Sequence, residues 1–457
     1  MKHLITIFVS LLVGVVSMVG QNVDLTITTL KKGELASLLK DKESTIKSLA
    51  VRGPIGEKDF PALWSATFHG TVETIDLTGA DIENDWIPTS AFFNAKEQLI
   101  SDGPWTGITN LYSNLRHIYL PETIVEFGDI AFRNTSLEEI ELPSSLEIIG
   151  ESCFLYCEKL ANEVLEIPEG VTAIERNTFY GCKSLKCHLK LPSTLRMIGE
   201  YAFQGVPLKS IDFPMALEKM EMYAFRLNEL SELYLPVVIF DEYDFGQFSS
   251  SRYLEKVEIA EGVTEIPMEF FHGCTELKEV NLPESIESIG ESAFYMNYSL
   301  NSIELPEGLE SIGKDAFKLC KSLEYVVFPS TMKYLGRTSC EYWESIKGIS
   351  CKATVPPVCD FNDMINSAFI ELPFDEEVCK KCPLYVPRGC AELYKNAMGW
   401  CFFSTIIETD DFPTSGLDDV TFEGKNDNTI YNLNGQQISR PAKGQIYIRD
   451  GRKYIDF

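Results

Sequence analysis

Cysteine and histidine are the side chains of this sequence that could act as nucleophiles, bases or metal ligands. The 457 residues include 13 cysteines and 5 histidines. Cys379-Lys-Lys-Cys382 has the C-x-x-C spacing of zinc and redox sites. The sequence has no second C-x-x-C pair, and no histidine lies near this one. We therefore expect no metal site and no cofactor.

Two cysteines stand beside histidines, in Cys187-His188 and in His272-Gly-Cys274. A catalytic pair needs hydrogen-bond reach and a third group that orients the base. Strand alternation would place Cys187 and His188 on opposite sides. G-x-S-x-G, H-E-x-x-H and phosphate-binding glycine loops are absent from the sequence. We expect a protein that is not an enzyme. An enzyme site in segments 81–110 or 246–253, or at the cysteine-rich end, is the alternative.

The charge of the chain restricts its partners. The sequence has 40 Lys and Arg against 68 Asp and Glu, a net charge of −28, and no basic cluster. Proteins that read phosphates normally carry a basic patch, so we expect no nucleic-acid partner. The hydrophobic fraction of 45% is enough for a folded core.

An internal repeat must position any functional side chain. Each unit of the repeat is counted from one anchor position, which is usually a proline. Apolar residues stand three and one positions before the anchor and three and six positions after it, and an aromatic residue usually stands eleven positions after it. The alternating step predicts a half-buried strand that the proline ends, and the aromatic side chain would fill the interior. Stacked units would share one core. The anchors, 22 to 25 residues apart, are Pro121, Pro143, Pro168, Pro192, Pro214, Pro236, Ala260, Pro283, Pro306 and Pro329.

The pattern L-x-x-I-x-L-P-x-x-L-x-x-I-G-x-x-A-F-x-x-C closely resembles the BspA-like leucine-rich repeat family of bacterial secreted and cell-surface proteins. Leu300 to Cys320 matches it almost without departure, and the resemblance covers residues 111–329 well. It implies a β-rich leucine-rich repeat solenoid, with short strands stacked in a ladder, and adhesion to host matrix or other cells. Segments 35–39, 46–51 and 72–77 resemble the family's N-terminal cap and divergent first repeats. Leu384-Tyr-Val-Pro387, Tyr394 and Trp400 resemble its closing unit.

Three departures from the repeat predict irregular structure. Phe245 follows Pro236 by only nine residues, so that residues 246–253 would be extra chain, a local irregularity or a protruding loop. Residues 81–110 are too many for one unit and indicate an insertion. In the unit of Pro329, Cys340 replaces the aromatic residue.

The cysteines divide into two groups. Cys157, Cys182, Cys274 and Cys320 lie fourteen residues after their anchors, a recurrent interior position, and Cys153 takes a position usually held by alanine. We expect these to be core residues, although Cys157 and Cys182 are equivalent in adjacent units and a bridge between them stays open. For the irregular C-terminal group, disulfides are credible. That group is Cys340, Cys351, Cys359, Cys379, Cys382, Cys390 and Cys401.

The two ends differ from the repeat. Lys2 and the apolar run to Val19 predict a secretory signal peptide at 1–20, cleaved after Ser17 or Gly20. The first cysteine is Cys153, which argues against a lipoprotein signal. No later segment is apolar for long enough to cross a membrane. We expect a cap with divergent first repeats at 21–110, regular repeats at 111–345, a cysteine-rich closing part at 346–408, and a linker with a small β module at 409–457. Similarity to C-terminal β modules of secreted bacterial proteins implies an export or attachment signal; a cap on the solenoid is the alternative.

Outward strand positions are the candidate binding residues, because solenoid sheets offer extended surfaces. They are mainly acidic with scattered tyrosines, and a strand face without a ligand is the alternative. We expect an exported, non-enzymatic protein that binds a protein or glycan of host or neighbouring cells at the bacterial cell surface; a structural spacer that displays its C-terminal module is the other hypothesis. The candidates are Tyr119, Glu141, Glu166, Lys190, Asp212, Tyr234, Glu258, Asn281, Glu304 and, from the neighbouring strip, Tyr325.

Overall fold

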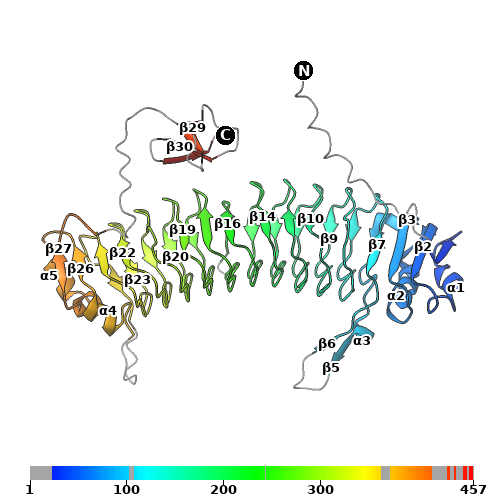
Figure 1. The fold of residues 1–457 in the computed structure, drawn as a ribbon, viewed down its shortest axis with the longest axis horizontal. Coiled ribbons are helices and arrows are strands. Elements are labelled where there is room, and N and C mark those ends of the chain that lie inside the picture. The colour runs from blue at the N-terminus through cyan, green and yellow to red at the C-terminus, as the bar shows by residue number, and fades with distance from the viewer. Residues whose placement is uncertain are drawn as a thin grey trace. The chain divides into compact units, whose positions relative to one another are not determined.

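The computed structural model describes residues 23–101, 108–241, 243–361 and 371–413, together with four short strands between 430 and 455. The predicted signal peptide lies outside the described residues. The chain separates after Pro413 into two compact units. The larger unit is a stack of coils, each with two strand sides and one turn side (Figure 1).

The first strand side contains the I-x-L step before each anchor. Its strands are parallel and lie in register from coil to coil, so that Leu165 pairs with Leu189 and Leu189 with Ile211. We call this side ladder one. Its sheets are β1 (Leu25–Thr28), β2 (Ser48–Ile55), β3 (Thr74–Ile82) and β7 (His117–Tyr119); β10 (Val164–Glu166), β12 (His188–Lys190) and β14 (Ser210–Asp212); β16 (Glu232–Leu235), β17 (Lys256–Ile259) and β19 (Glu279–Asn281); and β22 (Tyr325–Phe328), β24 (Gly348–Cys351), β26 (Leu384–Val386) and β27 (Ile406–Glu408).

The second strand side, ladder two, follows the anchor and consists of two-residue parallel strands. Glycine follows these strands where neighbouring coils approach closely: a Cβ on Gly336 would lie 2.4 Å from the carbonyl carbon of Gly313. The strands are β4 (Trp86–Ile87), β8 (Glu126–Phe127) and β9 (Ile148–Ile149); β11 (Ala173–Ile174), β13 (Met197–Ile198) and β15 (Lys219–Met220); and β18 (Glu265–Ile266), β20 (Ser288–Ile289), β21 (Ser311–Ile312), β23 (Tyr334–Leu335) and β25 (Val358–Cys359).

The turn side has no assigned strand, yet its backbone also joins the coils. The N–H groups of Tyr201, Phe203 and Gly205 donate to carbonyl oxygens of the next coil at 2.8–3.0 Å. In most regular coils the residues nine and thirteen positions after the anchor have positive φ, as at Tyr201 (58°) and Leu227 (62°). Only a few per cent of non-glycine residues adopt this conformation, so the turn side holds a strained backbone in coil after coil.

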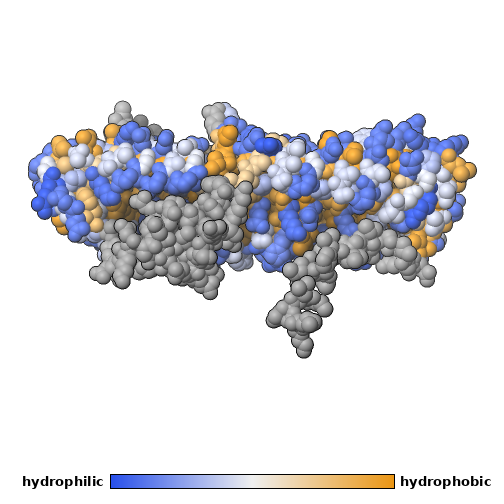
Figure 2. All heavy atoms as spheres, turned by 90° about the horizontal axis from the view of Figure 1, so that it is seen from above, coloured by the Kyte–Doolittle hydropathy of each residue, from blue (hydrophilic) through white to orange (hydrophobic). Residues whose placement is uncertain are grey.

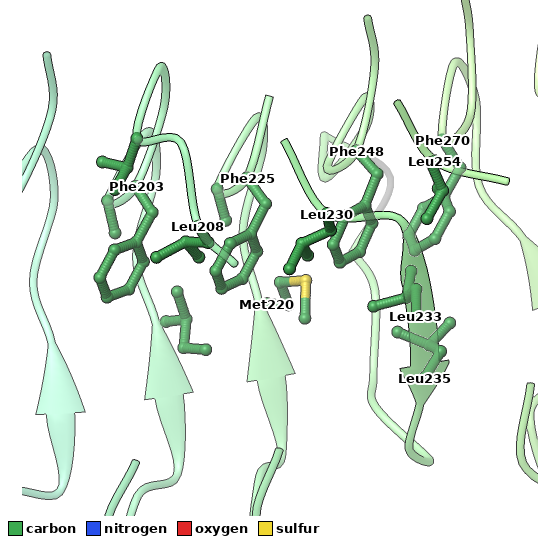
Figure 3. Close-up of a cluster of buried hydrophobic side chains, with 14 of the residues drawn as sticks. Phe203, Leu208, Met220, Phe225, Leu230, Leu233, Leu235, Phe248, Leu254 and Phe270 are labelled. Carbon is green, nitrogen blue, oxygen red and sulfur yellow. The ribbon is translucent and has the colours of Figure 1, made fainter. Parts of the chain in front are cut away.

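A column of phenylalanine rings supports the turn side from within. Rings of neighbouring coils are stacked with centroids 5.2–5.5 Å apart over most of the column, and Figure 3 shows Phe203, Phe225 and Phe248 in line above the inward leucines. The predicted single apolar core is confirmed. The column comprises Phe92, Phe132, Phe154, Phe179, Phe203, Phe225, Phe248, Phe271, Phe294 and Phe317.

The recurrent cysteines lie in this core, as predicted. Cys153, Cys157, Cys182, Cys274 and Cys320 are fully buried. The thiols of Cys157 and Cys182 donate to the carbonyl oxygens of Phe132 and Phe154 at 3.1 and 3.2 Å, so they satisfy carbonyls of the preceding coil. All thirteen cysteines are free thiols, and only Cys401 is exposed. Apart from Cys401, the C-terminal cysteines therefore contribute to the core, and none of the group forms a disulfide.

The two irregular segments have different outcomes. Residues 81–110 contain the predicted insertion: α3 (Ala95–Gln98), β5 (Leu99–Ser101) and β6 (Ile108–Asn110), whose strands form an antiparallel hairpin beside the stack (Figure 1). Residues 246–253 do not protrude. Phe248, not Phe245, enters the ring column, twelve residues after its anchor. The ring of this coil therefore stands one residue later than in the other regular coils. Ladder two is interrupted in the same coil, where Ile239 forms only an isolated bridge with Lys219.

Short helices occur mainly towards the ends of the larger unit. The first are α1 (Leu35–Leu39), η1 (Glu57–Asp59), α2 (Phe60–Phe68) and η2 (Glu83–Asp85). The last are α4 (Glu376–Lys381), α5 (Ala391–Asn396) and η3 (Trp400–Phe402). Trp400 is buried and its indole N–H donates to the Pro357 carbonyl at 2.9 Å; the Tyr394 hydroxyl donates to the Ala353 carbonyl at 2.7 Å. These bonds tie α5 and η3 to the coil that contains β24 and β25.

The second compact unit contains an antiparallel sheet in the order β29-β28-β30-β31. Two of its pairs enclose the dipeptides Asn434-Gly435 and Asp450-Gly451, where the sequence predicts hairpin turns. The strands are β28 (Ile430–Asn432), β29 (Gln437–Ile438), β30 (Ile446–Arg449) and β31 (Arg452–Ile455).

Candidate binding surface

The outward face of ladder one carries the candidate residues. Along β12 and β17, exposed or half-buried side chains alternate with buried ones, which is the alternation expected of a half-buried strand. None of the ten candidates is buried. Six are exposed, and Tyr119, Glu258, Asn281 and Tyr325 are half-buried.

The strand register brings some candidates together and separates others. Glu166, Lys190 and Asp212 are direct neighbours on β10, β12 and β14. Tyr234, Glu258 and Asn281 are direct neighbours on β16, β17 and β19. Tyr119 pairs with Asp76 of β3. Tyr325, which stands two positions earlier in its coil than the other candidates, pairs with Gly348 of β24. Glu141 and Glu304 lie where no strand is assigned.

Some charged side chains on this face pair with one another. Lys190 Nζ lies 3.3 Å from Glu166 Oε2, and Lys256 Nζ lies 2.8 Å from Glu279 Oε1. The hydrogen bond to Glu279 raises the pKa of Lys256, although partial burial opposes this. Exposed pairs of this kind contribute about 0–1 kcal/mol, so they organise the surface more than they stabilise it.

The tyrosines are the side chains of this face best suited to contact a partner. Burial, followed by the charges of Glu141 and Asp76, raises the pKa of Tyr119. Burial and Glu258 raise the pKa of Tyr234. Both hydroxyls therefore stay protonated at neutral pH and can donate hydrogen bonds, while the rings offer flat apolar surface.

Gly348 and Tyr385 extend this face beyond the residues identified from the sequence. A Cβ on Gly348 would lie 3.2 Å from Tyr325 Cδ1 and 3.3 Å from Tyr385 Cε2, so the rings flank a site without a side chain. Ser350, beside it, is buried and its hydroxyl has no hydrogen-bond partner. Tyr385 could have been found because it stands two residues before Pro387, as Tyr119 does before Pro121. Gly348 lacks that signal, since Lys352 replaces the proline.

An open hollow lies elsewhere, between α2 and the start of the insertion. It has a volume of about 400 Å³ and is lined mainly by apolar and small side chains, including Phe60, Trp64 and Phe93; Glu57 and Lys96 are its charged residues. Within the described ranges, no group of three or more His, Cys, Asp or Glu could hold a metal. No described helix combines the length and apolarity needed to cross a bilayer.

The space-filling view shows polar and apolar side chains interspersed (Figure 2). Apolar residues occur in small groups, and no continuous apolar strip runs along the described part of the visible surface. Large apolar patches mark many obligate interfaces. The mixed surface fits polar recognition with isolated aromatic contacts.

Comparison with known proteins identifies the repeat. The model of the BspA type leucine rich repeat region matches residues 109–165, 162–247 and 241–360. A leucine-rich repeat protein of Bacteroides ovatus is similar over 65% of this chain and 78% of its own, with 22% identity and a TM-score of 0.46. A leucine rich cell surface protein of Faecalibacterium prausnitzii has 21% identity over 59% and 88% of the two chains, with a TM-score of 0.32.

The pneumococcal vaccine antigen PcpA covers 81% of this chain and 82% of its own, with 18% identity and a TM-score of 0.37. No match was found among proteins of curated function. The family model alone spans more than half of the 457 residues, from the first regular coil into the closing part. The chain therefore belongs to the BspA type leucine-rich repeat family.

Proposed function

We propose that this protein is an exported, non-enzymatic repeat protein that binds a partner protein of host or neighbouring cells through the outward face of ladder one. The observation that carries the proposal is the face itself: outward side chains in register over successive coils, with tyrosines among mutually paired charges. A face of this kind offers many contact points to one extended partner.

The tyrosines would supply most of the binding energy. Protein interfaces concentrate affinity in a few aromatic and arginine residues, while paired rim charges contribute little. Tyr119, Tyr234 and Tyr325 lie on separate coils, so they would contact a surface that extends along the stack. A glycan on this face is the second possibility within the same proposal.

The test is binding of the purified chain, residues 21–457, to intact host and bacterial cells. We expect saturable binding that the triple variant Tyr119→Ala, Tyr234→Ala, Tyr325→Ala weakens by about 10-fold or more, since aromatic hot spots are commonly worth 2 kcal/mol or more. Tyr334→Ala is the matched control, because Tyr334 is 40% exposed but lies on ladder two.

Treating the cells with protease before the assay distinguishes a protein partner from a glycan. Unchanged binding by the triple variant would refute the assignment to ladder one. Equal loss from Tyr334→Ala would point to a general effect on the surface.

A spacer that displays its C-terminal module is the second candidate function, and the separate compact unit after Pro413 favours it. Fractionation of cells into medium, envelope and cytoplasm, with and without residues 410–457, tests both export and attachment. Release of the truncated chain into the medium would support attachment through the module. Retention of full-length protein in the cytoplasm would refute export.

A further inference from the structure

A second surface lies on the turn side of the coils, where aromatic side chains from consecutive coils touch one another. Ring centroids are 5.4 Å apart for Tyr156–Tyr180, 6.3 Å for Tyr180–Tyr201, 5.6 Å for Tyr201–Tyr223 and 5.1 Å for Tyr223–Phe245. All five are half-buried. We call this row the aromatic edge.

Two arginines at this edge lie over aromatic rings. The guanidinium carbon of Arg226 lies 4.9 Å from the centre of the Tyr223 ring, and that of Arg133 lies 4.8 Å from the centre of Phe93. The charge of Arg133 also acts on the Tyr156 hydroxyl, which places it beside the row. Neither arginine side chain has an ion pair or hydrogen bond within the described part of the chain.

Most arginines of the described ranges are paired with a carboxylate. The chain has a net charge of −28, and Arg116, Arg176 and Arg196 each pair with a glutamate. Burial lowers the pKa of Arg133, so its charge is partly desolvated and uncompensated. A half-buried guanidinium without a partner loses hydration that a ligand oxygen could restore.

Further polar groups lie between the arginines. The side-chain oxygen of Gln204, in the coil of Tyr201, is buried without a partner. The Tyr223 hydroxyl donates to Glu269 Oε2 at 3.2 Å. The half-buried tyrosine hydroxyls and guanidinium groups therefore give the edge donors and acceptors beside its aromatic rings, whereas the Gln204 oxygen lies beneath the surface.

We propose that the aromatic edge is a binding site for an uncharged polysaccharide strand that lies along the stack of coils. Sugar rings have apolar C–H faces that stack on aromatic rings, and their hydroxyls both donate and accept hydrogen bonds. Prolines in a proline-rich peptide have no N–H to offer, so such a peptide would leave the acceptors of the edge unused. Polyanions are disfavoured by the net charge of the chain.

The hollow beside α2 continues this site at one end. Phe93, on which Arg133 lies, also lines the hollow of about 400 Å³ together with Phe60 and Trp64. A strand that follows the edge toward the N-terminal coils therefore reaches this open hollow, whose aromatic side chains are almost fully buried and whose rim could contact a terminal sugar.

The test is affinity electrophoresis of the full chain in gels that contain an α-glucan, a mixed-linkage β-glucan, a xylan or a galactomannan. We expect at least one of these to retard the protein, with little dependence on salt because no charged groups of the ligand are involved. Tyr180→Ala with Tyr223→Ala should weaken retardation by about 10-fold or more, and Arg226→Ala should also weaken it.

Two matched controls make the result specific. Tyr180→Phe with Tyr223→Phe keeps both rings and should retain most of the binding. The ladder-one triple variant should bind the polysaccharide as the unaltered chain does, which separates this site from the proposed partner face. Circular dichroism and thermal unfolding check that each variant is folded.

Retardation by none of the four polysaccharides would overturn the proposal, as would equal retardation of the alanine variant. Binding of a polyproline peptide that requires Tyr180 and Tyr223, without polysaccharide binding, would overturn it in favour of a peptide site.

Discussion

The strand side of ladder one and the turn side belong to the same coils but are built by different means. Ladder one uses ordinary parallel pairing, and its outward side chains form pairs such as Lys256–Glu279. The turn side repeats positive φ angles at equivalent positions, such as Leu227 and Tyr201, and its outward aromatics touch from coil to coil.

The difference shows where this fold can tolerate change. Outward residues of ladder one can vary because alternation alone keeps them in water. The turn side is held by the buried phenylalanine column and by backbone hydrogen bonds between coils, so it depends on particular inward residues. A binding surface whose sequence must vary rapidly is better placed on ladder one. A binding surface that needs a fixed geometry is better placed at the aromatic edge.

Removal of a ring from the phenylalanine column should have the largest effect on stability. Phe203→Ala should lower the free energy of unfolding by about 3–5 kcal/mol, because Phe203 is fully buried between Phe179 and Phe225. Leu189→Ala, on the strand side, removes fewer atoms and should cost less. Urea unfolding followed by circular dichroism measures both. An equal or larger loss from Leu189→Ala would show that the column is not the main support.

The rate at which the buried thiols are alkylated measures how often the turn side opens to solvent. Burial raises the pKa of Cys157 and of Cys274 to about 12. At pH 8 their thiolate populations are on the order of 1,000-fold below that of an ordinary cysteine. We expect alkylation of native protein at exposed Cys401 first, measured by peptide mass spectrometry.

Alkylation in denaturant, where every thiol should react, is the control. Fast labelling of Cys157 under native conditions would mean that the turn side opens frequently. Failure of the C-terminal cysteines to react in denaturant without reductant would reveal disulfides in the isolated protein.

The same substitution should have opposite effects on the two sides. Leu227→Gly relieves a positive φ of 62° at a position where Gly181, Gly205 and Gly273 stand in other coils, and should stabilise the protein by about 0.5–1 kcal/mol. Lys190→Gly, within β12, should destabilise it by a similar amount. Thermal unfolding of both variants is the measurement. Destabilisation by both would mean that the Leu227 side chain outweighs its backbone strain.

Much of this architecture could be predicted from the sequence because it rests on local periodicity. The I-x-L-P step located the strands, and the aromatic eleven residues after each anchor located the ring column. The spacing indicates the wrong residue in the coil of Pro236, because it places Phe245 in the ring column and Phe248 occupies that position. The fold accommodates this one-residue change in spacing by an interruption of ladder two, and the periodicity of the sequence does not reveal that interruption.

The candidate surfaces were harder to predict because they depend on contacts between coils. Alternation identified the outward strip, but not the neighbours of Gly348, which come from β22 and β26. The aromatic edge was missed because Tyr156, Tyr180 and Tyr201 stand at three different distances from their anchors. Those positions converge only because the turn-side backbone alternates between positive and negative φ.

The uniform register of the coils has a consequence for how such a gene can change. Pro283 and Pro306 occupy equivalent positions in successive coils, and Glu284 and Glu307 follow them. A deletion of residues 284–306 would join Pro283 directly to Glu307 and leave the flanking strands and rings in matching positions. Unequal recombination can therefore lengthen or shorten the protein by whole coils, and the reach of the molecule becomes a trait that evolves separately from its chemistry.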